Sequence, residues 1–311
     1  MTGKIHHLNC GTLNPFSSRF LFPANGFKDT RFLVNHCLLI ETGKGLVLVD
    51  SGLGRQDIER TDITLGKVRP AVIQPALLKI ECAINQVERL GYNRDDVRHI
   101  VLTHMDFLQT GGLSDFPNAT IHVMRREFEA ANAPQTLLER WRYVQAHWQH
   151  SAKWKLHSCV GGLWKGLEFS PVFPDTDDIL LISLPGHTRG HCGVAIKKPT
   201  GWLLHCGDAT LNINHIKQPQ NYSVNGFVSA SLECCRADRL HSLQRLATLA
   251  EALSNNKESQ ASDPERIDFA CSLDPDNFYQ LRFNPSSDVP EADQSQLSFP
   301  LQAAPQDEVT A

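Results

Sequence analysis

The feature that most restricts the fold of this chain is a pair of similar segments, each a glycine and a short apolar run followed by small residues and an acid. The first is Gly45–Gly52, GLVLVDSG, and the second is Gly201–Asp208, GWLLHCGD. Short apolar runs bounded by glycine are typical of buried β-strands. Because the runs lead directly into Asp50 and Asp208, we expect both acids to lie at strand ends, where loops carry polar chemistry.

Strand-like and helix-like segments surround this pair in both halves of the chain. The predicted strands are Phe32–Ile40, Leu46–Val49, Ile100–Leu102, Thr120–Met124, Ile179–Leu184, Val194–Ile196, Trp202–His205 and Ile267–Cys271. The predicted helices are Leu77–Leu90, Arg125–Asn132 and Leu240–Leu253, the last with Asp238 in its N-cap region. Two β-rich halves, each with a helix behind it, fit two sheets packed face to face with helices outside.

A stretch rich in tryptophan and histidine, Trp141–His157, lies between the two halves. We expect it to form a helical insertion or lid over a pocket, although a solvated amphipathic helix explains its composition almost as well. Because loops carry specificity, this stretch and His6–Asn25 are the predicted walls of a binding pocket.

Charge, apolar runs and cysteines restrict the class of protein. The net charge is -4 and there is no run of Lys or Arg, which argues against a nucleic-acid partner. The longest apolar runs are strand-length, short of the about 20 residues that cross a bilayer. The start of the chain has no apolar segment of a signal peptide, so we expect a cytoplasmic protein. The nine cysteines are scattered and form no CxxC pair, as expected of buried thiols in a reducing compartment.

The domain prediction is a single domain over residues 1–283. Residues 284–311 contain no Lys or Arg and are dominated by Asp, Glu, Pro, Ser and Gln, a composition typical of a disordered acidic tail. Nothing in the sequence indicates an oligomeric state.

Four segments concentrate residues that can bind metal or move protons. They are LTHMDFLQTGG at 102–112, PGHTRGH at 185–191, CGDA at 206–209 and SLDP at 272–275. Their order, spacing and flanking residues resemble the motifs of metallo-β-lactamase-fold hydrolases, and the resemblance runs from roughly His7 to Asn277. It implies an α/β fold, a four-layer αββα sandwich, with a metal site at the rim of the stacked sheets.

The first motif of that family is Leu-Thr-His-x-His-x-Asp-His-x-Gly-Gly. Laid on this sequence without a gap, the motif puts His104 at the first ligand position and Asp106 where the second His belongs. Leu108 takes the place of the Asp and Gln109 that of the last His. Lactonase-like branches of the family also carry an acid at the position of Asp106, so this substitution is typical of a branch.

The later motifs of the family supply the remaining ligands. His187 matches the third-motif His, Asp208 matches the carboxylate that bridges two metals, and Leu273 replaces the final His. The resemblance therefore implies one complete metal site, in which the ligands are His104, Asp106, His187 and Asp208. Two imidazoles and two carboxylates suit one Zn, Mn or Fe ion.

The second metal site of the family is expected to be empty. Leu108 and Leu273 cannot coordinate a metal, and Gln109 is at best a weak neutral ligand that can hydrogen-bond a water without taking its proton. These three lost ligands belong to the same metal, which indicates selective loss of one site.

Supporting roles are implied for other residues. Asp50 is expected to be a buried structural acid, and His191 to support the site through hydrogen bonds. Arg189, between the two His of its motif, either forms a salt bridge with a supporting acid or meets an anionic substrate. Simpler alternatives remain for the ligands: His104 as a core histidine, Asp106 as an exposed loop carboxylate, Asp208 as a turn cap.

Three functions remain open from the sequence. The first is a mononuclear metallohydrolase with weak or altered activity on an ester, lactone or similar small carbonyl substrate, with Asp106 and Asp208 as catalytic carboxylates. The second is a non-catalytic protein that keeps the fold as a ligand-binding or regulatory module, since apolar residues in a former metal site lower the need for an ion. The third, an oxidoreductase or sulfur-handling mononuclear iron protein, fits two His and carboxylates.

Overall fold

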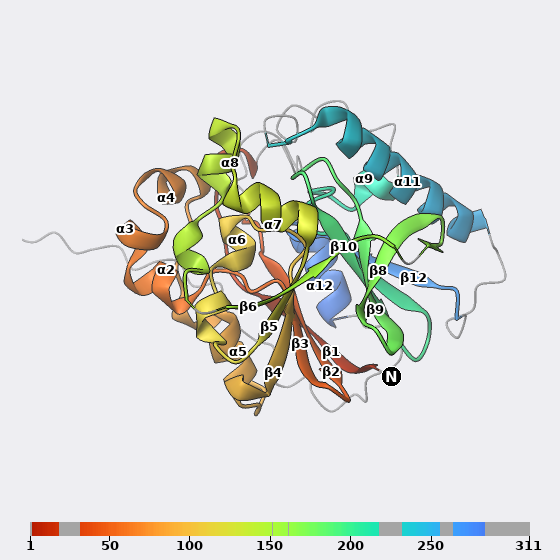
Figure 1. Cartoon of the computed structure of the whole chain (residues 1–311), viewed down its shortest axis with the longest axis horizontal. Coiled ribbons are helices and arrows are strands. Elements are labelled where there is room, and N and C mark those ends of the chain that lie inside the picture. The colour runs from red at the N-terminus through yellow and green to blue at the C-terminus, as the bar shows by residue number, and fades with distance from the viewer. Residues whose placement is uncertain are drawn as a thin grey trace, which may run out of the picture.

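Two six-stranded sheets organise the computed structural model, which describes residues 2–18, 32–150, 152–160, 162–217, 232–255 and 264–283. The first sheet is built, in order, from β1 (Thr2–Asn9), β2 (His36–Thr42), β3 (Gly45–Val49), β4 (Val97–Val101), β5 (Thr120–Met124) and β6 (Lys153–His157). The second has the order β12 (Ile267–Ala270), β11 (Trp202–His205), β10 (Cys192–Lys197), β9 (Thr176–Ser183), β8 (Leu167–Phe173) and β7 (Leu163–Trp164). The red-to-yellow half of the chain in Figure 1 thus forms one sheet and the green-to-blue half the other.

The two sheets pack face to face, because successive residues of a strand point to opposite faces. In β2, Leu38 and Ile40 join a buried cluster with Leu181 of β9 and Val194 of β10, between the sheets. Leu39, between them in sequence, belongs to a different cluster on the outer face of the first sheet. Both faces of each sheet are therefore buried.

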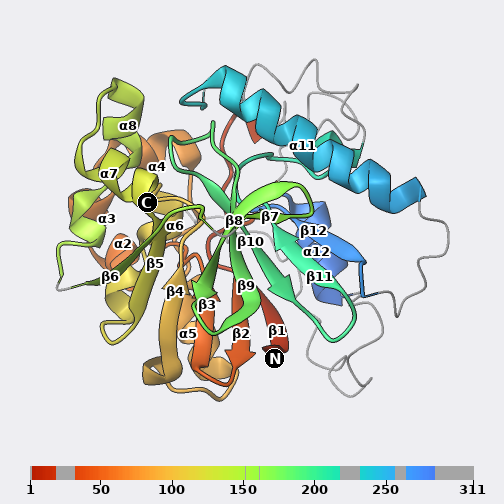
Figure 2. The ribbon, with the colours of Figure 1, turned by 45° about the vertical axis from the view of Figure 1, so that its right-hand side comes forward.

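Helices cover the outer faces. Against the first sheet pack α5 (Ala83–Arg89) and α7 (Arg125–Asn132), and against the second α9 (Asn214–Lys217) and α11 (Arg236–Asn255). Figure 2 shows α11 along one side of the strands and α7 along the other. This arrangement confirms the predicted four-layer αββα sandwich. The other α-helices among the described residues are α2 (Arg55–Glu59), α3 (Thr61–Thr64), α4 (Val68–Ile73), α6 (Phe107–Thr110), α8 (Leu137–Arg142) and α12 (Pro275–Phe283).

The predicted helix Leu77–Leu90 was wrong in its first half. Leu77 has a positive φ of 52°, a left-handed conformation that does not continue a helix, and Leu78 and Ile80 are exposed. Only a three-residue 3-10 turn precedes α5, which begins at Ala83.

The stretch Trp141–His157 is not one helix. Its first two residues end α8, Gln145–His147 is a 3-10 turn, and Lys153–His157 is the edge strand β6, parallel to β5. The turn is held by His147, whose ring nitrogens contact Asp57 Oδ1 and Thr110 Oγ1, each at 2.9 Å. The residues KWKLH alternate polar and apolar with a period of two, which is the pattern of a half-buried strand and not of the predicted helix.

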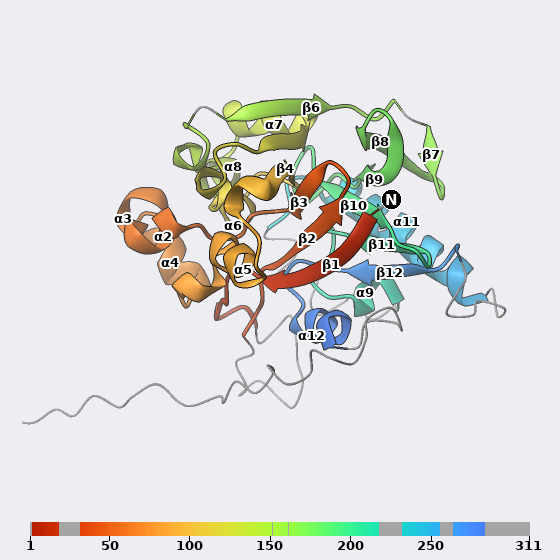
Figure 3. The ribbon, with the colours of Figure 1, turned by 90° about the horizontal axis from the view of Figure 1, so that it is seen from below.

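Smaller differences concern element ends. The strand predicted from Phe32 begins at His36, and Phe32 is exposed. Asp238 lies inside the first turn of α11, which begins at Arg236. Figure 3 shows α12 beside β1, where Phe278 of this helix packs edge-on against the ring of His36.

Three further sequence predictions concern the cysteines, membrane spans and segments outside the described residues. All nine cysteines are free, and six of them are buried. Across the described ranges no helix combines the length and apolar character needed to span a bilayer. The predicted tail 284–311 and residues 19–25 of the predicted pocket wall lie outside the described residues.

Candidate metal centre

The predicted ligands come from loops that follow strands of both sheets. The loop after β4 carries His104 and Asp106, the loop between β9 and β10 carries His187, and Asp208 follows β11. All four residues are buried, with His104 completely so. Asp106 is therefore not the exposed loop carboxylate of the simpler alternative.

The structure groups three of these side chains, His104, Asp106 and His187, and places the fourth, Asp208, beside the two histidines. His104 Nε2 and His187 Nε2 lie 3.7 and 3.4 Å from Asp106 Oδ2, and one ligand atom from each of the three residues lies within 4.8 Å of the other two. Asp208 Oδ2 lies 3.8 Å from His104 Nε2 and 3.6 Å from His187 Nε2. Asp208 therefore joins the group from the side of the two imidazoles.

Unpartnered atoms show that this donor set fits a cation. His104 Nε2, Asp106 Oδ1 and Asp208 Oδ1 are buried without a hydrogen-bond partner in the described part of the chain. Burying such groups unpaired costs about 1–3 kcal/mol each, and more when they are charged. Ligands at about 2.0–2.2 Å from a tetrahedral ion lie roughly 3.4 Å apart. The four histidine–carboxylate separations of 3.4–3.8 Å are close to that spacing, although Asp208 lies outside the three-residue group of His104, Asp106 and His187.

A hydrogen-bonded relay orients His104. Asp50 accepts hydrogen bonds from Thr103 N and Thr103 Oγ1, both at 2.8 Å, and Thr103 Oγ1 lies 2.9 Å from His104 Nδ1. Because the threonine proton goes to Asp50, the hydroxyl oxygen accepts from His104 Nδ1–H, which leaves Nε2 as the ring atom that faces the other ligands. Asp50 holds this place with a positive φ of 55°, and burial raises its pKa to about 7.

His191 holds the loop that carries Asp208. Its Nδ1 donates to the carbonyl oxygen of Leu184 at 2.9 Å, and its Nε2 accepts the backbone N–H of Asp208 at the same distance. Gly207 is required beside it, because a Cβ at this position would come within 2.6 Å of the imidazole. Both ring nitrogens of His191 therefore serve to position Asp208.

Sequence reasoning missed Arg142, at the end of α8. Its side chain is completely buried, and Nη1 donates to Asp106 Oδ2 at 2.7 Å and to His187 Nε2 at 2.6 Å, while Nη2 donates to the carbonyl oxygen of Leu232. The signal in the sequence was a single charge inside the otherwise apolar run Trp141–Val144. A charged side chain in such a run is either exposed or paired inside the protein.

These contacts shift the pKa values of the site residues. Burial lowers the pKa of His104, but the charge and hydrogen bond of Asp106, together with the charges of Asp208 and Asp50, outweigh it and raise that pKa to about 9. For His187, burial and the positive charge of Arg142 lower the pKa to about 4. Burial would raise the pKa of Asp106, yet the charges of Arg142 and His104 hold it well below its usual range.

The positions of the expected second metal site have an apolar environment. Leu108 and Leu273 belong to the same buried cluster, together with Leu211. Gln109 is completely buried, and neither its amide nitrogen nor its amide oxygen has a partner among the described residues. Its backbone carbonyl instead accepts from Ser51 N and Ser51 Oγ, at 2.9 and 2.7 Å.

An ion pair and two hydrogen bonds to a buried carboxylate tie the loops of the site together. Arg189 Nε pairs with Glu139 Oε1 of α8 at 2.7 Å, so a supporting acid is its partner here. Glu127 of α7, which sequence reasoning also missed, accepts from Met105 N at 2.9 Å and from Gly190 N at 3.0 Å. An acid in the first turn of a helix is common, and nothing in its sequence context singled out Glu127.

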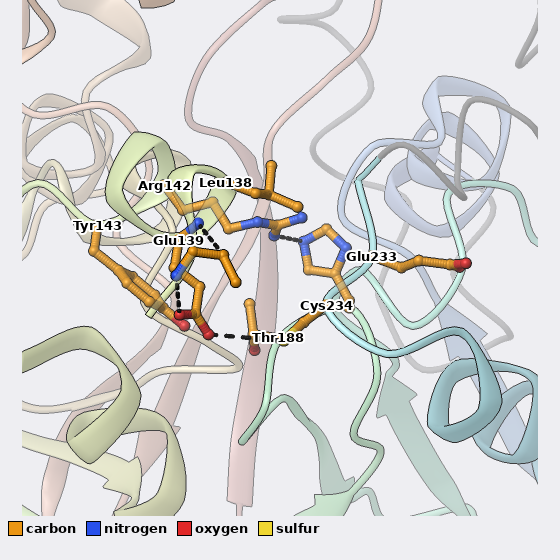
Figure 4. Close-up of a pocket in the computed structure, with 9 residues that line it drawn as sticks. Leu138, Glu139, Arg142, Tyr143, Thr188, Glu233 and Cys234 are labelled. Atoms are coloured by element: carbon orange, nitrogen blue, oxygen red, sulfur yellow. Dashed lines mark hydrogen bonds between the residues drawn. The ribbon is translucent and has the colours of Figure 1, made fainter. Parts of the chain in front are cut away.

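A cavity opens beside the ligands. Its walls are Thr136, Leu138, Glu139, Arg142, Tyr143, His187, Thr188, Glu233 and Cys234. In Figure 4, Arg142 and Glu139 reach into it from α8. Arg142 and Tyr143 belong to the predicted wall Trp141–His157, whereas none of these lining residues comes from His6–Asn25.

Comparison with known proteins identifies the family of this chain. A model described as the metallo-beta-lactamase superfamily matches residues 30–230. A Mycobacterium tuberculosis protein named a probable metallo-hydrolase is 43% identical over 209 residues, which are 66% of this chain and 62% of that protein. An N-acyl homoserine lactonase of Bacillus thuringiensis is 29% identical over 175 residues, 56% of this chain and 63% of the lactonase. The match thus spans less than two thirds of each of these relatives.

Solved structures share the fold. A lactonase with N-hexanoyl-L-homoserine bound at its catalytic metal centre superposes with a TM-score of 0.60 at 22% identity, over 89% of this chain and 95% of that one. A Staphylococcus aureus protein described as a probable metal-dependent hydrolase gives a TM-score of 0.62 at 17% identity, over 87% and 89% of the two chains. At these identities the likeness concerns the fold.

Proposed function

We propose, from the premise that this chain belongs to the metallo-β-lactamase superfamily, that it is a mononuclear metal-dependent hydrolase of an ester, lactone or similar small carbonyl substrate. The observation that carries the proposal is the convergence of His104, Asp106 and His187, with Asp208 beside both imidazoles and His104 Nε2 buried without a partner among the described residues. The chain's similarity to lactonases and to a probable metallo-hydrolase supports the same reaction class.

The four converging side chains would hold one Zn, Mn or Fe ion. When bound there, such an ion polarises a carbonyl oxygen and lowers the pKa of water. The chain's own contribution is orientation: the relay from Asp50 through Thr103 fixes the ring of His104, and His191 fixes Asp208. A ligand held in one orientation binds more tightly than a mobile one.

Asp208 is the residue we assign to proton transfer. Hydrolysis adds water across the acyl C–O bond, so a base must take one proton from water and an alcohol must leave with a proton. Asp208 Oδ1 is buried and has no partner among the described residues, whereas Asp106 Oδ2 is engaged by Arg142. Because Leu108 supplies no further carboxylate, we expect the activity to be weak or altered.

A non-catalytic, ligand-binding or regulatory role is the second candidate. It is favoured by the packing of Leu108 and Leu273 in one apolar cluster, which removes the environment of a second ion. Restoring Leu108→Asp, Gln109→His and Leu273→His together discriminates between the candidates. If the wild type holds no metal and the triple variant gains metal and hydrolysis, the chain is a non-catalytic member of its family.

The decisive experiment on the first candidate combines metal analysis with turnover. Protein purified without added metal is analysed for Zn, Mn and Fe, and is then assayed on a panel of lactones and aryl esters. We expect about one equivalent of metal. His187→Ala should lower both metal content and turnover at least tenfold, whereas His241→Ala, at an exposed position on α11, should lower neither.

A cytoplasmic location belongs to the same proposal. It is supported by nine free cysteines, six of them buried, as expected of a chain kept in a reducing compartment. The proposed partner is a small-molecule substrate, for which the cavity beside His187 provides room.

A further inference from the structure

Arg142 makes contacts that a metal ion would also need. Its Nη1 donates to Asp106 Oδ2 at 2.7 Å and to His187 Nε2 at 2.6 Å, which are two of the atoms that converge on the centre. The guanidinium is completely buried, and its Nε has no partner in the described part of the chain. A permanent positive charge therefore lies directly against two of the four proposed ligands.

These contacts exclude coordination of the same atom by an ion. A neutral imidazole nitrogen has one lone pair in the plane of its ring. While His187 Nε2 accepts the hydrogen bond from Arg142 Nη1, that lone pair is not available to a metal. Two positive charges within a few ångströms of Asp106 would also repel each other in this buried environment.

We propose that Arg142 is a built-in competitor for the metal site, an internal cation that holds Asp106 and His187 until an ion displaces it. This inference rests on the proposed metal site and adds to it a control of metal loading. When the guanidinium holds the ligands in most molecules, only a small fraction of molecules can bind metal. The measured affinity is then the intrinsic affinity multiplied by that fraction.

The structure offers the displaced side chain a place to go. Arg142 already lines the cavity beside the centre, together with Thr188 and with Glu139, whose carboxylate also pairs with Arg189 (Figure 4). Thr188 Oγ1 is buried and unpartnered within the described residues, so it can accept a hydrogen bond from the moved guanidinium.

The backbone of α8 can stay in place during this exchange. The Glu139 carboxylate accepts a hydrogen bond from the backbone N–H of Thr136, which completes a capping box at the start of the helix. The same carboxylate forms an ion pair with Arg189 at 2.7 Å. The helix is thus fixed to the loop that carries His187. Displacement then requires rotation of the Arg142 side chain alone.

The test measures metal affinity of the metal-stripped full-length chain. Zn²⁺ is titrated against a chromophoric chelator in the wild type, in Arg142→Met and in the matched control Arg140→Met, whose residue is exposed on the same helix. We expect Arg142→Met to bind Zn²⁺ at least tenfold more tightly than the wild type, and Arg140→Met to stay within twofold. Thermal unfolding of each stripped protein checks that the variants are folded.

A second measurement uses the wild type, so the test does not depend on a variant. The side-chain ¹⁵N resonances of Arg142, assigned with Arg142→Lys, are followed by NMR together with those of the His187 ring during Zn²⁺ addition. We expect both sets to shift together as one equivalent binds. Zn²⁺ on His187 Nε2 with unchanged Arg142 signals would overturn the inference.

The outcomes separate this inference from the function it rests on. Equal, tight Zn²⁺ binding by the wild type and Arg142→Met overturns the competition but leaves the metal site standing. No binding by any of the three proteins overturns both. Tighter binding by Arg142→Met alone, with coupled shifts in the wild type, supports both.

Discussion

At the scale of single residues, the centre depends on uncharged groups as much as on the ligands. Thr103 is the clearest case, because one hydroxyl connects Asp50 to His104. Asp50 is buried with a pKa raised to about 7, since burial disfavours its charge. Position 103 therefore needs a side chain that accepts a hydrogen bond from the His104 ring and donates one to the Asp50 carboxylate.

Replacing Thr103 with Val tests this relay. The variant keeps the shape of the side chain but removes the acceptor for His104 Nδ1–H, so the ring loses its preferred tautomer and orientation. We expect Zn²⁺ affinity to fall by about 10–100-fold. Chelator competition measures it, with Thr120→Val on β5 as the control. Unchanged affinity in Thr103→Val would show that the relay does not orient His104.

At the scale of elements, α8 is joined to the third-motif loop by the pair Glu139–Arg189. The carboxylate of Glu139 is 4% exposed and the guanidinium of Arg189 25% exposed, at 2.7 Å. Burial would raise the pKa of Glu139, but backbone N–H groups at the start of α8 and the charge of Arg189 lower it. Removing one partner of such a pair leaves a buried charge, which costs more than the pair contributes.

We therefore expect Arg189→Ala to lower the free energy of unfolding by about 1–3 kcal/mol, a value reduced for the partial exposure of the guanidinium. Amide exchange over residues 133–142 should speed up in the same variant, because α8 loses its anchor. Lys44→Ala, which breaks the exposed pair Lys44–Asp175, is the control and should leave the free energy of unfolding close to that of the wild type. Equal losses in both variants would contradict the anchoring role.

At the scale of the whole molecule, three histidines form a chain across the first sheet. His99 Nδ1 lies 3.0 Å from His122 Nε2, and His122 Nδ1 lies 3.0 Å from His157 Nε2. His99 and His122 both pack against Phe173 of the opposite sheet. Burial lowers the pKa of His122 to about 3 and that of His157 to about 4.

The row of three histidines His99, His122 and His157 predicts that the protein loses stability in acid. Because the folded pKa values of His122 and His157 lie below the unfolded value of about 6.5, the unfolded chain binds protons first as the pH falls. The contribution is complete above about pH 6.5 and is lost as the pH falls toward the folded pKa values, by up to about 1.4 kcal/mol per pH unit for each residue.

Denaturant unfolding between pH 7.5 and 5 measures this dependence. His122→Phe should lower the slope of unfolding free energy against pH, because the variant removes one residue with a depressed folded pKa. His241→Gln, at an exposed position, should leave the slope as in the wild type. An unchanged slope in His122→Phe would show that this residue does not contribute to the acid sensitivity.

Much of this protein follows from sequence alone. Short apolar runs predicted most strands, because such runs are a local pattern. The residues at His104, His187 and Asp208 and around them indicated the family through their resemblance to its motifs. The fold class was confirmed, and the structure groups His104, Asp106 and His187, with Asp208 beside the two histidines. Leu77–Leu90 was wrong where the backbone of Leu77 is left-handed, which the helical stripe does not reveal.

Only the tertiary structure decided what surrounds those ligands. Arg142 reaches Asp106 and His187 from a helix more than 30 residues away from the first and more than 40 from the second. Glu127 likewise joins two motif loops from α7. Which charged groups pair in the interior depends on how helices and strands pack together in space. The distance between two residues along the sequence does not predict such a pair.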